Sequence, residues 1–168
     1  MLWAGCVVSM QRVKRLGWSA AATAAYAAVM LVLDRGMRKT GGPGIIPFEL
    51  AGNRERTQQI LDVWGPEGRR WARWSLWLDF GYMLTYGTAA LLLIERTRSR
   101  HGHPIALRLL PIAAVAGDAV EGVALLRVLD GVDLDANARR ARGAASVKFA
   151  LLAIGLGYTI TGAVHRRS

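Results

Sequence analysis

Residues 107–129, LRLLPIAAVAGDAVEGVALLRVL, form a long apolar stretch that indicates the fold class. Apart from a base near each end, its only ionisable residues are two acids in its interior. A transmembrane helix needs about 20 predominantly apolar residues to cross roughly 30 Å of hydrocarbon. Because lipid offers the backbone no hydrogen-bonding partner, such a span has to be helical. The stretch therefore predicts a transmembrane helix that carries two acids.

Three further apolar blocks of similar length accompany this one, at about residues 17–33, 74–94 and 147–164. Hydrophobic residues make up 52% of the 168 residues, and they gather in blocks instead of following the period of a half-buried strand or surface helix. The sequence therefore predicts an all-α protein built as a four-helix transmembrane bundle. Residues 17–168 are expected to form one domain, and residues 1–16 a cytoplasmic N-terminal segment.

The first block follows the basic stretch Gln11–Arg15, an order that also occurs in secretory signal peptides. No small-residue cleavage pattern follows the block, so we expect an uncleaved signal anchor. Met10 stands directly before the basic stretch and is an alternative start to Met1. The single cysteine, Cys6, excludes an intrachain disulfide and a cysteine-based metal site.

Residues 34–73 form one long connection, which we expect on the extracytoplasmic side. Gly41–Gly44 breaks regular structure, and Asn53 is then a good N-cap for a short helix over residues 54–64. Gly65–Pro66 ends this helix. Its apolar stripe consists of Ile60, Leu61 and Trp64. The stripe favours an amphipathic helix on the bilayer surface or on the end of the bundle, and a solvated loop helix without a function is the alternative.

The formal charge is +10, from 22 Lys and Arg against 12 Asp and Glu. The bases flank apolar blocks, so anionic lipid headgroups are their expected partners and nucleic acid is not. Four spans place the N-terminus, the turn 95–106 and the C-terminus on one side. The bases there are Arg12, Lys14, Arg15, Arg96, Arg98, Arg100, Arg166 and Arg167, beside one acid, Glu95. The opposite side has as many bases, in longer segments with more acids. We therefore expect a multi-pass protein of the bacterial plasma membrane with cytoplasmic termini.

Four ionisable residues lie inside or at the edge of the apolar blocks: Asp79, Asp118, Glu121 and Lys148. A charged side chain at the bilayer centre costs about 2.5–3.5 kcal/mol on insertion scales, so pairing, protonation or a wet cavity must offset it. Asp118 and Glu121 are three residues apart and share a helix face.

Asp79, Tyr82 and Tyr86 share a face of the second block, and one of the two tyrosines is expected to be a packed aromatic. The depths of the side chains can be compared at about 1.5 Å per residue. The outer half of the bundle would then contain Asp79, Glu121, Arg127 and Lys148, with Asp118 near the midplane.

Two interpretations of this cluster follow. In the first, Lys148 and Arg127 neutralise Asp79 and Glu121, and the polar network fixes helix register. The protein is then a non-enzymatic accessory or assembly subunit with a protein partner, or a homo-oligomer. In the second, the acids line a cavity. The protein then binds a lipid or isoprenoid, or is an intramembrane acid/base enzyme with Asp118 and Glu121 as proton donor and acceptor and Asp79 or Tyr82 as orienter. A small proton- or cation-coupled transporter that uses Asp118 is a further alternative.

Other chemical motifs are incomplete. His101 and His103 share one turn but have no third metal ligand nearby in sequence. Residues 133–144 begin like a calcium-binding loop but lack its glycine at position six and its glutamate at position twelve. The sequence has neither a nucleophile motif nor a phosphate-binding loop. We therefore expect no metal and no cofactor.

Three stretches carry a resemblance: residues 77–80 with Tyr86–Gly87, the segment Gly117–Gly122, and Pro47–Gly52 followed by Val63–Gly65. Together they resemble a group of uncharacterised four-helix integral membrane proteins of actinobacteria. The resemblance covers most of the chain from about residue 17, and it implies a fold but no activity. The EXPERA group of sterol isomerases and sterol-binding proteins also has four helices with buried acids. Its acids lie in other helices and its motifs are missing here, so this is a similarity of architecture.

Overall fold

The computed structural model describes the chain over residues 2–164, and the side chains of residue 11 and of residues 14–164. The elements are α1 (Leu2–Arg38), α2 (Ile45–Glu49), α3 (Arg54–His101), the 3-10 helix η1 (Ile105–Arg108), α4 (Leu109–Leu129) and α5 (Leu134–Val164). No strand occurs within these described residues, which confirms the all-α prediction. Arg166 and Arg167, two of the bases used to predict orientation, lie outside the described residues.

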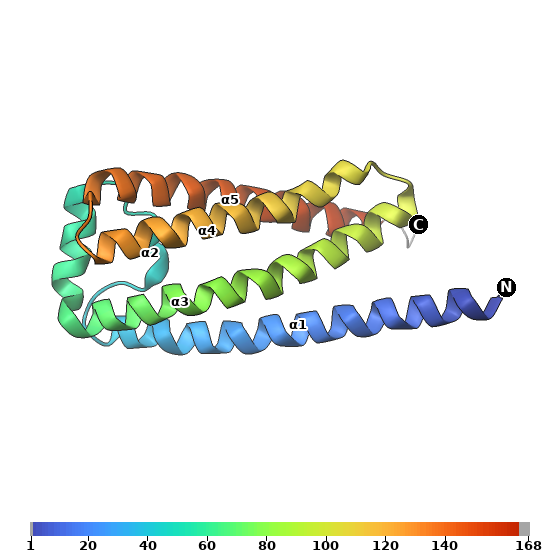
Figure 1. Cartoon of the computed structure of the whole chain (residues 1–168), viewed down its shortest axis with the longest axis horizontal. Coiled ribbons are helices and arrows are strands. Elements are labelled where there is room, and N and C mark those ends of the chain that lie inside the picture. Colours follow the sequence, from blue (N-terminus) through green and yellow to red (C-terminus); the bar gives the residue numbers. More distant parts are fainter. Residues whose placement is uncertain (1, 165–168) are drawn as a thin grey trace.

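Three predicted apolar blocks lie within α1, α3 and α5, and the block of residues 107–129 begins in η1 and continues through α4. Four helices are long and apolar enough to cross a membrane, judged by their length and composition. Figure 1 shows that successive long helices run in opposite directions. The start of α1, the turn from α3 to α4 and the end of α5 therefore lie at the same end of the molecule. The connections from α1 to α3 and from α4 to α5 lie at the opposite end, which we call the loop end.

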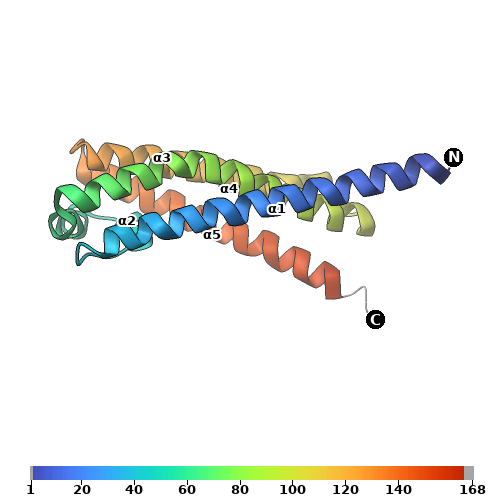
Figure 2. The same cartoon turned by 90° about the horizontal axis from the view of Figure 1, so that it is seen from below.

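The helices form two closely packed pairs. Helix α4 packs along α5, and α1 packs along α3, while α3 also contacts α4 and α5 and joins the pairs. Towards the end that carries the termini, α5 diverges from α1, as Figure 2 shows. The space between α1 and α5 is therefore lined by side chains from both helices instead of being closed by direct helix packing.

The first segment of α3 is the short helix predicted over residues 54–64. Asn53 caps it as expected, because its side-chain oxygen accepts a hydrogen bond from the Arg56 amide at 2.9 Å. At Gly65 the backbone has φ 56° and ψ −163°, a conformation that glycine adopts easily, and the chain turns sharply before Pro66. The segment before this kink lies across the loop end of the bundle in Figure 1.

A hydrophobic core closes the loop end. Trp64 and Phe48 are each 1% exposed, and their ring centroids are 4.9 Å apart. The Trp64 indole Nε1 donates a hydrogen bond to the Pro43 carbonyl at 2.7 Å, so its polar atom is also satisfied. Ile60 and Leu61 are buried in the same core. The predicted helix is therefore a packed cap on the bundle and not a solvated loop helix.

Candidate functional site

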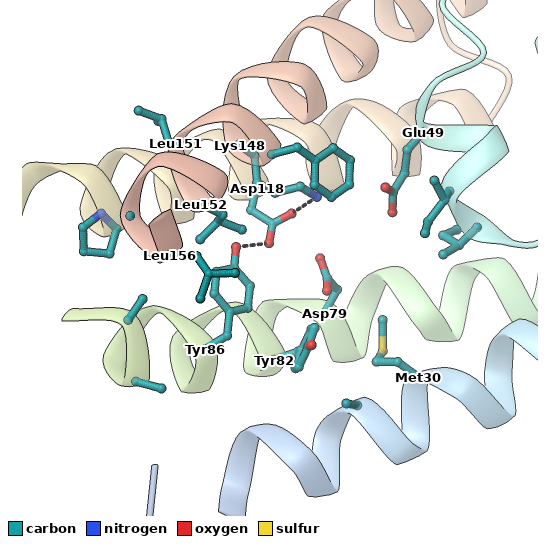
Figure 3. Close-up of a pocket in the computed structure, with 18 of the residues that line it drawn as sticks. Met30, Glu49, Asp79, Tyr82, Tyr86, Asp118, Lys148, Leu151, Leu152 and Leu156 are labelled. Atoms are coloured by element: carbon teal, nitrogen blue, oxygen red, sulfur yellow. Dashed lines mark hydrogen bonds and ion pairs between the residues drawn. The ribbon is translucent and has the colours of Figure 1, made fainter. Parts of the chain in front are cut away.

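A cavity of about 760 Å³ lies between α1, α3 and α5, with α2 at one end. Towards the termini its lining is apolar. Residues of this part include Ala27, Ala90, Leu93, Leu152 and Leu156. Towards α2 the lining becomes ionisable, and Figure 3 shows how these side chains meet. We call this cavity the groove. It has a polar end near the loop end of the bundle and an apolar end deeper among the helices.

Lys148 of α5 is the centre of the polar end. Its Nζ lies 2.7 Å from Asp118 Oδ1 and 2.7 Å from Glu121 Oε2, both on α4. Asp118 and Glu121 meet the same ammonium group because they are three residues apart on one helix face, as predicted. All three side chains are buried. The ammonium group compensates the cost of burying the two acids, and the contact joins α4 to α5.

Tyr86 extends this network to α3. Its hydroxyl donates a hydrogen bond to Asp118 Oδ2 at 2.5 Å, drawn as a dashed line in Figure 3. Of the two tyrosines, Tyr86 is therefore a member of the polar network. Tyr82 packs its ring edge-on against Tyr86, with centroids 5.4 Å apart, and also lies against Tyr26 of α1. Tyr82 is thus the packed aromatic of the pair, although it still lines the groove.

Asp79 reaches the groove from α3, one helical turn before Tyr82. Figure 3 shows its carboxyl group directed into the space between Tyr86 and α2. Its electrostatic neighbours are Asp118, Lys148 and Glu49. Among the described residues it takes part in no ion pair, in contrast to Asp118. The structure therefore brings Asp79 to the cluster as predicted, but Lys148 pairs with Asp118 and Glu121 instead of with Asp79.

Glu49 is the member of the site that the sequence analysis missed. It ends α2, and Figure 3 shows its carboxyl group directed towards Lys148. Burial raises the pKa of this carboxyl group, while the Lys148 ammonium and a hydrogen bond with Glu121 act in the opposite direction. The available signal was a single acid inside the otherwise apolar segment of residues 45–51, but that segment belongs to a connection and not to a predicted span.

Asp34 and Arg38 lie at the rim of the polar end. The Arg38 guanidinium contacts Asp34 Oδ2 at 2.6 Å, and the other oxygen of Asp34 accepts a hydrogen bond from the Ile45 amide at 2.8 Å. Asp34 therefore holds the start of α2 against the end of α1. Gly44 precedes this contact, and a Cβ atom there would lie 2.0 Å from Asp34 Oδ1, so the close approach requires glycine.

Arg127 does not join the site. Its side chain is exposed on α4, and within the described residues it forms no ion pair with the cluster. The prediction that Arg127 neutralises the buried acids is therefore wrong. Asp118 and Glu121 already share a buried face of α4, and the exposed Arg127 side chain lies off that face. A similar depth in the bundle therefore does not place Arg127 on the face of α4 that carries the two acids.

The remaining candidates from the sequence lie away from the groove. His103 Nδ1 is hydrogen-bonded to the Tyr158 hydroxyl at 2.8 Å, and the rings of His101 and His103 stack. Asp135 forms an ion pair with Arg139. Within residues 2–164, no group of three or more histidine, cysteine or acidic side chains is arranged to hold a metal ion.

The arrangement combines two chemical environments. The apolar end can accept a hydrocarbon chain, and the polar end offers carboxyl groups, one ammonium group and tyrosine hydroxyls within reach of one another. Comparison with known proteins adds no relative: no family model, no curated protein and no solved structure matches the chain. The groove and its ionisable side chains are therefore the basis on which a function can be assigned.

Proposed function

We propose that this chain is a multi-pass protein of the bacterial plasma membrane that binds an amphipathic lipid or isoprenoid in the groove. In this proposal all four long helices cross the bilayer, both termini lie in the cytoplasm, and the loop end faces the extracytoplasmic side. The length and composition of the four helices support the crossing. The basic flanks of the predicted first span support the orientation.

The main support for this proposal is that the groove has one polar end and one apolar end. A volume of about 760 Å³ lies within the range of roughly 300–1,000 Å³ that is typical of ligand pockets. From Lys148 to Thr159, α5 lines it over about 16 Å at 1.5 Å per residue, which is long enough for much of a lipid chain. A ligand with a polar group at one end and a hydrocarbon chain behind it matches this lining.

The position of α1 supports access from the bilayer. Helix α1 packs along α3, whereas α5 diverges from it (Figure 2). Leu31 and Leu156 line the groove from these two helices and are both more than half exposed. In a bilayer these exposed apolar side chains would meet lipid chains. A lipid could then enter sideways between α1 and α5 without crossing water.

A groove-filling pair of substitutions tests the proposal. Ala27→Trp together with Ala90→Trp places two indole rings in the apolar end, while Ala28→Trp with Ala153→Trp places the same rings on exposed positions outside it. Each protein is purified and its bound lipid is identified by mass spectrometry. We expect a defined amphiphile with the wild type and the control pair, and at least about ten-fold less of it with the groove pair. Equal lipid in both pairs would refute the proposal.

A second candidate function is supported by a different observation. The contacts of Lys148 with Asp118 and Glu121 join α4 to α5, which is what a purely structural network in an accessory subunit would do. Glu121→Gln separates the two functions, because Glu121 is buried behind Lys148 and is not among the residues lining the groove. If the variant is well folded and keeps its lipid but loses a partner protein that co-purifies with the wild type, the accessory role is favoured.

A further inference from the structure

The charges at the polar end restrict which lipid fits. Four carboxyl groups, those of Glu49, Asp79, Asp118 and Glu121, surround the single ammonium group of Lys148. Asp34 and Arg38 at the rim form a pair of opposite charges and leave this balance unchanged. The polar end therefore has four carboxyl groups for one ammonium group, although the chain as a whole is strongly basic.

A phosphate head group has no available cation in this site. Both cationic side chains that line the groove are already held by carboxylates, Lys148 by Asp118 and Glu121 at 2.7 Å and Arg38 by Asp34 at 2.6 Å. A phosphate would have to break these contacts and lie beside the displaced carboxylates. Since like charges repel strongly in a medium of low dielectric constant, the site disfavours an anionic head.

An amine head group, in contrast, would find hydrogen-bond acceptors in this site. Glu49 and Asp79 take part in no ion pair among the described residues. Each shares a hydrogen bond with another carboxyl group, Glu49 with Glu121 and Asp79 with Asp118, and Figure 3 shows both at the space between α2 and α3. An ammonium group has three hydrogen-bond donors and no acceptor, so it complements carboxylates and not the Lys148 ammonium. Tyr82, next to Asp79 on the groove wall, adds an aromatic ring that is compatible with a cation.

We infer that the groove takes a lipid whose polar end carries an amine and no phosphate, with the amine between Glu49 and Asp79 and the hydrocarbon chain along α3 and α5. This inference rests on the proposed lipid-binding function and specifies the class of lipid. The observations behind it are the charge balance of the groove and the geometry of its two carboxyl groups that lack ion pairs.

Photo-crosslinking with matched competitors tests the inference. The protein is placed in nanodiscs of uncharged phosphatidylcholine and labelled with a hexadecylamine that carries a diazirine in its chain. Labelled peptides are mapped by mass spectrometry, and hexadecylamine, hexadecanol and hexadecyl phosphate compete for the site. We expect labelling of the α5 peptide that contains Leu152, and competition by the amine at a concentration at least about ten-fold lower than by the alcohol or the phosphate.

Charge-removing variants locate the amine. Glu49→Gln with Asp79→Asn should abolish the preference for the amine over the alcohol, while Glu67→Gln, on an exposed part of α3 outside the groove, should leave the preference unchanged. The two single variants are measured as well, in case the pair does not fold. A preference retained in every folded groove variant would overturn the inference.

The outcomes also separate this inference from the proposed function. Labelling in the groove that is competed equally well or better by the phosphate or the alcohol would overturn the amine assignment and leave lipid binding in place. If the diazirine probe does not label the groove and no lipid co-purifies with the wild type, the proposed lipid-binding function itself is overturned.

Discussion

The two ends of the bundle differ in how far their apolar side chains are buried. At the loop end, Met37, Phe48 and Trp64 are at most 1% exposed and pack into one core. Towards the termini α1 and α5 separate (Figure 2), and Val29 and Ile160 are 45% and 54% exposed. Water drives apolar side chains together, whereas lipid chains solvate them as well as a protein interior does. If the four helices cross the bilayer as proposed, a hydrophobic core is needed only at the loop end, where the chain would meet water.

The polar cluster lies between these two regions. It is held by ion pairs and hydrogen bonds, which become stronger where water is excluded. The groove begins at this boundary because α1 and α5 are no longer joined by the loop-end core. Substitutions that affect only one of the two regions therefore test whether the regions are stabilised differently.

The largest expected effect is at the loop-end core. Trp64→Ala should lower the free energy of unfolding by about 3–5 kcal/mol, because it removes a fully buried indole ring and leaves a cavity. Trp74→Ala is the control, since Trp74 is 59% exposed in the region assigned to the bilayer, and it should change stability by less than about 0.5 kcal/mol. Thermal unfolding in detergent measures both. Equal losses would show that the two regions do not differ as described.

Lys148→Met should follow with a loss of about 3 kcal/mol, because it leaves the carboxyl groups of Asp118 and Glu121 buried without a cation. Lys39→Met removes the same charge from an exposed loop position and should have little effect. Adding Glu121→Gln to the Lys148→Met variant should restore part of the lost stability, which a double-mutant cycle measures. Strictly additive losses would contradict the network.

Glu121→Gln and Asp79→Asn should act on different properties. Glu121 contacts Lys148 directly, so Glu121→Gln should cost about 1–2 kcal/mol of stability. Asp79 is half-buried and forms no ion pair within the described residues, so Asp79→Asn should cost less stability than Glu121→Gln and instead reduce the amount of bound lipid amine. Unfolding curves and mass spectrometry of the bound lipid measure the two effects. A reversed order would place the ligand on the Glu121 side of Lys148.

A further small effect should come from the backbone at the loop end. Gly52 has φ +74°, so Gly52→Ala should cost about 1 kcal/mol through left-handed strain. Gly143 lies within α5, and a Cβ atom there would have no neighbour within 4 Å. Gly143→Ala should therefore be neutral or stabilise the helix slightly. A comparison of the two melting temperatures tests this, and a larger loss at Gly143 would contradict the described environment of α5.

Much of the fold followed from local rules. The four blocks became long helices because block length and apolar composition are properties of a continuous stretch. The Asn53 cap and the break at Gly65 were predicted because they depend only on neighbouring residues. The shared face of Asp118 and Glu121 was predicted for the same reason, since helix geometry relates residues three apart.

The helices, the shared face of the two α4 acids and a buried cation near them could thus be predicted from local sequence. Three features depended on tertiary packing: Glu49 of α2 reaches the polar end, Arg127 stays outside it, and α1 and α5 diverge and leave a groove. The physical reason is the range of the interactions. Backbone hydrogen bonds and helix periodicity act over a few residues, whereas the path of a loop and the rotation of one helix against another depend on packing between distant segments.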